Sequence, residues 1–98
     1  MKTGSELIAE GRQRQIEQEG WTPAHDNKHD GGTLVCAAVT YALEATFDGP
    51  ASKGTWFKKF WCWEDSWFKP KDKIRDLTRA GALIAAEIDR LQREAGNL

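Results

Sequence analysis

A chain of 98 residues can form one domain with a single modest core and is too short for two. Its 40% hydrophobic and 30% charged residues are typical of a globular protein and exclude wholesale disorder. A net charge of −1 excludes a general nucleic-acid binder, which would carry a marked basic excess.

The charge is distributed unevenly along the chain. Residues 1–52 carry four Lys or Arg and eight Asp or Glu, whereas residues 53–79 carry eight and four. Such a division can let copies pair head to tail, or can place a cationic patch beside a pocket. We therefore favour a homo-oligomer, with the second half of the chain providing the positive charge of any site.

Cysteine use and hydropathy indicate the cellular compartment. Cys36 and Cys62 are too few for a disulfide framework, and their apolar and aromatic neighbours predict packed thiols in a reducing environment. The first 15 residues lack an apolar stretch of signal-peptide length, and no segment approaches the roughly 20 apolar residues that span a bilayer. We expect a cytoplasmic protein without membrane contact.

The first predicted helix runs from Ser5, as its N-cap, to Glu19, and Gly20 is expected to end it. Arg12, Gln15 and Glu19 share its polar face at spacings of three and four. This face is either solvated and ion-paired, or it lets Arg12 and Gln15 reach into a pocket, where an Arg fork suits phosphate.

A polar loop, predicted from Trp21 onwards, contains two histidines four residues apart. His25, Asp26 and His29 could hold a divalent ion if the segment were helical. Pro23 and the glycines that follow favour a loop instead, in which these side chains cap free amides. We expect no metal here and keep the metal site as an alternative.

A second helix is predicted from a cap at Thr33 to about Ala45. Its many alanines permit close packing, which predicts that this helix is central.

The pattern loses its period between Phe47 and Pro70, and the irregular segment is rich in tryptophan. Seven aromatic residues fall within residues 56–68, and basic residues follow directly. Aromatic faces stack on nucleobases and cations bind phosphates, which predicts a nucleotide site. The alternative is a lid over the core combined with an oligomer contact. The candidate residues are Trp61, Trp63, Trp67, Lys69, Lys71 and Arg75.

The third helix begins after Pro70 with Asp72 as its cap and continues to about Ala95. Steps of three and four place one set of residues on a single face, where Gly81 would let another element approach closely. The set is Ile74, Leu77, Gly81, Ile84, Ile88 and Leu91.

Together these elements predict a mainly α fold: a small three-helix single domain, residues 1–98, with an irregular tryptophan-rich segment between the second and third helices. No nucleophile, phosphate-loop or paired-carboxylate motif is present, so we predict no catalytic residue, no cofactor and no enzyme activity.

Residues 12–30 resemble a group of small phage and prophage proteins with the pattern ERxRQxxxEGWTxxHDxxH. Gly11 stands where that pattern opens with Glu. Residues 67–88 also resemble the end of these proteins, so that the likeness covers about half of the chain. It implies a phage protein acting in the cytoplasm of the infected host. The matching residues are Arg12, Arg14, Gln15, Glu19, Gly20, Trp21, Thr22, His25, Asp26 and His29.

The order of motifs is also similar, more remotely, to the repeat domain of ryanodine receptors and its bacterial relatives. The run Gly20, Trp21, Thr22 and the segment from Leu34 to Tyr41 carry this likeness. Bacterial relatives of that domain are associated with nucleotide-type ligands. The resemblance implies a pocket lined by Arg12, Gln15, Trp21, His25 and Asp26.

Three functions follow as expectations. The first is a non-catalytic protein that sequesters a nucleotide-type signal of host defence, a cyclic oligonucleotide or an ADP-ribose derivative. The second is a protein–protein inhibitor of a host defence enzyme, acting through its tryptophan-rich face. The third is a metal-dependent nucleotide hydrolase that uses His25, Asp26 and His29.

Overall fold

The computed structural model describes residues 1–18, 31–48 and 54–96. Within these residues it has four α-helices and no strand: α1 (Gly4–Glu17), α3 (Gly31–Leu43), α4 (Thr55–Phe60) and α5 (Lys73–Glu94). A π-helical turn, Glu44–Asp48, ends α3, and a 3-10 turn, Asp65–Trp67, precedes α5. The mainly α fold predicted from the sequence is confirmed.

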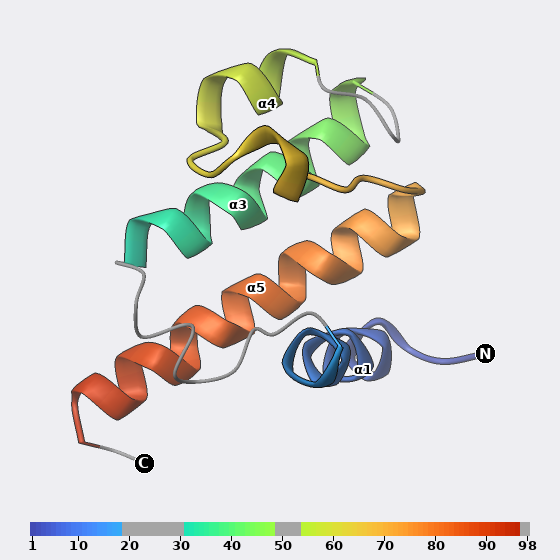
Figure 1. Cartoon of the computed structure of the whole chain (residues 1–98). Coiled ribbons are helices and arrows are strands. Elements are labelled where there is room, and N and C mark those ends of the chain that lie inside the picture. Colours follow the sequence, from blue (N-terminus) through green and yellow to red (C-terminus); the bar gives the residue numbers. More distant parts are fainter. Residues whose placement is uncertain (19–30, 49–53, 97–98) are drawn as a thin grey trace.

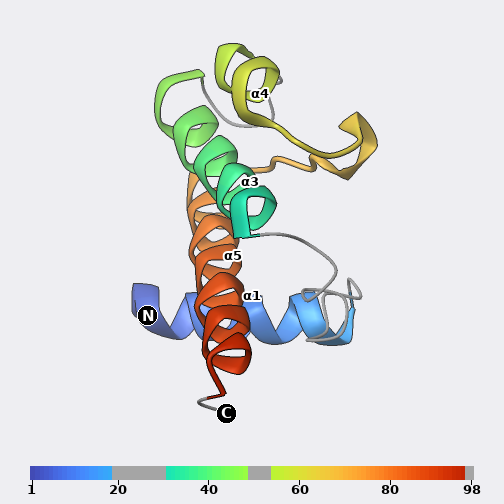
Figure 2. The ribbon, with the colours of Figure 1, turned by 90° about the vertical axis from the view of Figure 1, so that its left-hand side faces the viewer.

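The long helix α5 lies at the centre, between α3 on one side and α1 on the other (Figure 1). Helix α1 runs across α5 rather than along it (Figure 2). Helix α4 and the aromatic segment after it, residues 61–68, pack over α3 (Figure 1). The alanine-rich second helix is central as well, as predicted: α3 lies between α5 and α4, and its Ala37 and Ala38 are buried.

Helix α1 begins one residue before the predicted cap. Thr3, not Ser5, is the N-cap, and Glu6 completes a capping box. The Glu6 amide donates to Thr3 Oγ1 at 3.2 Å, and the Thr3 amide donates to Glu6 Oε1 at 3.0 Å. The Thr3 amide and the Thr3 hydroxyl, also 3.0 Å from Glu6 Oε1, both donate to the carboxylate and so lower the pKa of Glu6. Helix α1 ends at Glu17, two residues before the expected Glu19, with Gln18 as its C-cap; Gly20, the expected cap, lies outside the described residues.

Helix α3 begins at Gly31, so Thr33 lies inside the helix instead of capping it. Its far end holds α4, a helix that the sequence did not predict. The buried carboxylate of Glu44 accepts from the amides of Gly54 at 3.1 Å and Phe57 at 2.7 Å. A carboxylate satisfying the first free amides of a helix is a cap supplied from another element.

Aromatic and small residues from three helices make the core. Tyr41 packs on Phe68, with ring centroids 4.8 Å apart, and Phe68 stacks on Phe57 at 4.9 Å. Cys62 is exposed rather than packed, and its Sγ donates to the Phe60 carbonyl at 3.3 Å, whereas Cys36 is partly buried. The buried cluster is Leu34, Ala37, Ala38, Tyr41, Phe57, Phe68, Ala80 and Leu83.

Helix α5 has the predicted cap, since the Arg75 amide donates to Asp72 Oδ1 at 2.8 Å. Its buried face runs through Asp76, Ala80, Leu83 and Glu87 rather than along the predicted stripe. Only Gly81 of that stripe is covered: a Cβ at this position would lie 2.6 Å from Ile8 Cδ1 of α1. The close approach expected at Gly81 therefore occurs, and it is made by the side chain of Ile8.

Candidate functional site

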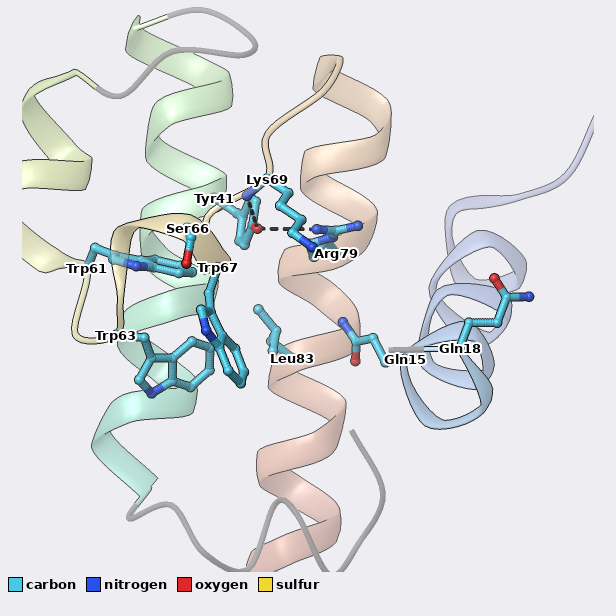
Figure 3. Close-up of a pocket in the computed structure, with 10 residues that line it drawn as sticks. All are labelled: Gln15, Gln18, Tyr41, Trp61, Trp63, Ser66, Trp67, Lys69, Arg79 and Leu83. Atoms are coloured by element: carbon cyan, nitrogen blue, oxygen red, sulfur yellow. Dashed lines mark hydrogen bonds between the residues drawn. The ribbon is translucent and has the colours of Figure 1, made fainter. Parts of the chain in front are cut away.

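A pocket of about 500 Å³ opens between α1, α3, α5 and the aromatic segment before α5 (Figure 3). Its size lies within the range of small-molecule sites. It is lined by Gln15, Gln18, Tyr41, Trp61, Trp63, Ser66, Trp67, Lys69, Arg79 and Leu83.

Three tryptophans form one wall of the pocket. Trp61 and Trp63 meet edge to face with centroids 5.4 Å apart, and Trp67 lies 6.4 Å from Trp63. Trp61 is fixed from behind by Phe68 at 4.9 Å, and its indole N–H donates to the Glu64 carbonyl at 3.0 Å. Trp67 is 48% exposed. The wall is thus rigid at its base and offers an accessible indole at its rim.

Two cations and a phenol form the adjoining wall. The Tyr41 hydroxyl oxygen accepts from the Lys69 amide at 2.9 Å and from Arg79 Nη1 at 3.3 Å. The Arg79 guanidinium also lies 5.4 Å from the Tyr41 ring centroid, within cation–π range. Burial raises the pKa of Tyr41, so the phenol stays neutral at pH 7. Tyr41 therefore orients Arg79 and fixes the backbone of Lys69 at the edge of the pocket.

Gln15 faces the tryptophan wall from α1, on the opposite side of the pocket (Figure 3). Its side chain is only 2% exposed, and its Oε1 has no hydrogen-bond partner among the described residues. A buried acceptor left without a donor costs about 1–3 kcal/mol. A donor on a bound ligand would remove this cost.

A smaller hollow adjoins the pocket and shares two of its residues, Gln15 and Arg79. Arg14 of α1 and Arg75 of α5 also line it. With Lys69, three arginines therefore lie around or next to the pocket. A cationic patch beside a pocket is one of the two arrangements that the charge distribution allowed, although Arg14 comes from the acidic part of the chain.

The structure brings five of the predicted site residues around one pocket: Gln15, Trp61, Trp63, Trp67 and Lys69.

The other predicted site residues lie elsewhere. Arg75 lines the adjoining hollow, whereas Arg12 is buried on α1 without lining the pocket. Lys71 is exposed, and its amide donates to Asp76 Oδ1 at 2.7 Å. Trp21, His25, Asp26 and His29 lie outside the described residues, as does the metal alternative built on them. In the described part of the chain, no three His, Cys, Asp or Glu side chains are grouped as metal ligands would be.

Sequence reasoning missed Tyr41, which shapes the pocket. A phenol in an otherwise apolar run of a helix needs a partner for its hydroxyl, and this requirement could have marked the residue. Arg79 follows Arg75 by one helical turn, so both arginines project from the same side of the helix start.

Asp76 is an unusual neighbour of this site because it is a carboxylate that is only 1% exposed. Burial raises its pKa, opposed by the hydrogen bond from the Lys71 amide and by the charge of Arg79. Its Oδ2 has no hydrogen-bond partner among the described residues. The ionised form of Asp76 in this buried position therefore lowers the free energy of unfolding.

Compared with known protein families, curated proteins and solved structures, the chain matches none of them. Among the described helices, none is long and apolar enough to cross a membrane.

Proposed function

We propose that this protein binds a nucleotide-type ligand in the pocket between Gln15 and the tryptophan wall, and that it does so without chemical change to the ligand. The observation that supports this most is the lining of the pocket, in which three tryptophans lie beside Lys69 and Arg79 and face Gln15, whose Oε1 has no hydrogen-bond partner among the described residues.

Each part of a nucleotide has a counterpart in the pocket. A base can stack on Trp67 or Trp63, because stacking on an indole suits every base and contributes about 1–3 kcal/mol. Gln15 Oε1 can accept from an exocyclic amine or ring N–H of that base. Lys69 and Arg79 supply charge-assisted donors for a phosphate, and the adjoining Arg75 extends them for a second one.

The biological role that we propose is sequestration of a nucleotide signal of host defence, such as a cyclic oligonucleotide or an ADP-ribose derivative. The resemblance of residues 12–30 to small phage proteins supports this role. A protein that only holds such a signal needs affinity and abundance, and the described pocket offers stacking and charge for affinity.

The test is a thermal-shift screen against cyclic di- and trinucleotides, ADP-ribose forms, NAD and ATP, followed by calorimetry. Binding at 100 times Kd stabilises a fold by about 2.7 kcal/mol, which corresponds to roughly 10 °C or more for a domain of this size. Chromatography of the incubated ligand, with and without magnesium, must recover it intact. Product formation would instead support the hydrolase alternative.

Matched variants locate the site on the pocket. Gln15→Leu should weaken binding, whereas Gln13→Leu, on the exposed side of α1, should not. Trp67→Ala should weaken binding at least about tenfold through lost stacking, and Phe47→Ala is its exposed aromatic control outside the pocket. Equal loss in variant and control would contradict the pocket as the site.

The protein–protein inhibitor remains the second candidate, because Trp67 and Phe47 are both exposed aromatic side chains, at 48% and 67%. Exposed aromatic anchors are typical of interfaces. A screen without any shift, combined with capture of one host enzyme that Trp67→Ala abolishes, would favour this function over nucleotide binding.

A further inference from the structure

Five large aliphatic side chains of α5 are exposed in the monomer along one line. Ile74 is 70% exposed, and the other four are between 48% and 52% exposed. Exposed apolar residues are normal when scattered, but a contiguous row of them marks a contact surface. The row, named here the α5 stripe, consists of Ile74, Leu77, Ile84, Ile88 and Leu91.

The α5 stripe lies on its own side of the helix. At 100° per residue, Leu77, Ile84 and Ile88 project about 100–140° around the axis from Leu83, which faces the core and the pocket. Within the row, Ile8 of α1 covers the position of Gly81, and the other five side chains are about half exposed or more. A partner on the stripe therefore leaves the pocket open.

The spacing of the stripe specifies the shape of its partner. With Gly81 included, the steps are three, four, three, four and three, so the row repeats every seven residues. This is the pattern by which one helix packs its side chains between those of another helix. A partner with a flat surface or a single pocket would not require six positions of α5 to follow this seven-residue repeat.

We propose that the α5 stripe is covered by the α5 stripe of a second copy of this chain, with the two helices antiparallel. The steps read the same in both directions about a point midway between Gly81 and Ile84. Reversal therefore places Ile74 opposite the partner's Leu91, and Ile84 opposite the partner's Gly81, where Ile8 of that copy supplies the side chain that the glycine lacks. A row that matches itself on reversal is what a two-fold interface requires.

The helix dipoles favour the antiparallel direction, because opposed dipoles attract each other and parallel dipoles repel. The charged side chains at the two ends of α5 add little to this preference. Glu94 is already paired with Arg90 of its own helix, at 2.8 Å from Nη1, and Asp72 lies between the exposed Lys71 and Lys73.

The exposed area is also of the right order for a dimer. With the exposed fractions given above, the five residues present an accessible area on the order of 500 Å² per copy. This area is near the upper end of the range for the largest apolar patch on a monomeric protein. A standard interface buries about 800 Å² on each partner. The stripe supplies the apolar part of such an interface, and flanking residues supply the rest.

The first test is sedimentation of the ligand-free protein over a concentration series. We expect a species of twice the 11.0 kDa monomer. Ile84→Glu places a carboxylate at the centre of the interface in both copies and should raise the dimer Kd by roughly 100-fold or more. Val35→Glu, an equally exposed aliphatic position on α3, is the matched control and should leave the dimer intact.

The second test fixes the direction of the helices by oxidative cross-linking in a Cys36→Ala, Cys62→Ser background. Ile84→Cys, close to the two-fold axis, should cross-link to its counterpart, whereas Ile74→Cys, about 26 Å from its own counterpart at 1.5 Å per residue, should not. A monomer at every concentration, an unchanged Kd in Ile84→Glu, or equal cross-linking at position 74 would overturn the proposal. No ligand is present in either test, so the outcome is independent of the proposed function.

Discussion

Gly81 is the position at which the packing of α1 on α5 can be tested, because the effect of Gly81→Ala on stability should change sign when Ile8 is shortened. Replacing a glycine within a helix by alanine normally stabilises the fold by about 1 kcal/mol. Here the added methyl group would meet Ile8 Cδ1 at 2.6 Å and Ile8 Cγ1 at 2.8 Å. Overpacking of this kind costs about 1–3 kcal/mol, so we expect Gly81→Ala to be neutral or to destabilise the protein by up to about 2 kcal/mol.

The same substitution should have the opposite effect once Ile8 is shortened. In an Ile8→Ala background the clash is removed, and Gly81→Ala should then stabilise by about 1 kcal/mol. The double-mutant cycle thus predicts a coupling energy of about 1–3 kcal/mol between the two positions. Urea denaturation at one fixed protein concentration measures all four variants, and 1 kcal/mol corresponds to roughly 4–8 °C in Tm.

A control position and a refuting result complete this design. Gly4 has no atom within 4 Å of the place of its missing Cβ, so Gly4→Ala should be tolerated in both backgrounds. If Gly81→Ala stabilised the protein equally with and without Ile8, α1 would not cross α5 at this glycine, and the arrangement of the two helices would be refuted.

Three further substitutions test the structure around the pocket. Glu44→Ala removes the buried acceptor of the first α4 amides and should lower the free energy of unfolding by about 2–3 kcal/mol in urea denaturation. A loss below about 0.5 kcal/mol would show that this carboxylate does not hold α4. Tyr41→Phe removes the acceptor of the Lys69 amide and of Arg79, and should cost about 1 kcal/mol and weaken ligand binding in calorimetry. Burial raises the pKa of Asp76 in the folded protein above its ordinary 3.8. Protonation of Asp76 therefore stabilises the fold at low pH, and this stabilisation is lost as the pH rises through the folded-state pKa. Asp76→Asn should therefore lack this fall in stability in a pH series of urea midpoints, and parallel curves for the two proteins would contradict the assignment.

Local patterns in the sequence predicted the elements that depend on local chemistry. The long helix and its Asp72 cap are confirmed, because both depend on residues within one or two turns. The start of α1 was misplaced because Ser5 resembles a cap, although only Thr3 has a Glu three residues later. Helix α4 was missed because its cap, Glu44, lies on another element.

The candidate site shows the same division between local and tertiary information. The tryptophans and Lys69 are close in sequence and were singled out by their clustering, and Gln15 by its helical spacing. The role of Tyr41 could not be found in this way, because its hydrogen bond with Arg79 joins residues 38 positions apart. That these residues bind a ligand stays a prediction.

The pocket wall has a further consequence for how its specificity can change. Trp61, Trp63, Ser66, Trp67 and Lys69 come from nine consecutive residues between α4 and α5. The remaining helices continue to pack on one another through residues outside that short connection. Replacements of these five residues can therefore alter which molecules fit, whereas Phe68, which lies in the same stretch, is buried in the core and would have to be kept. Related chains would be expected to diversify fastest there, as an evolving population follows changes in the molecules it must capture.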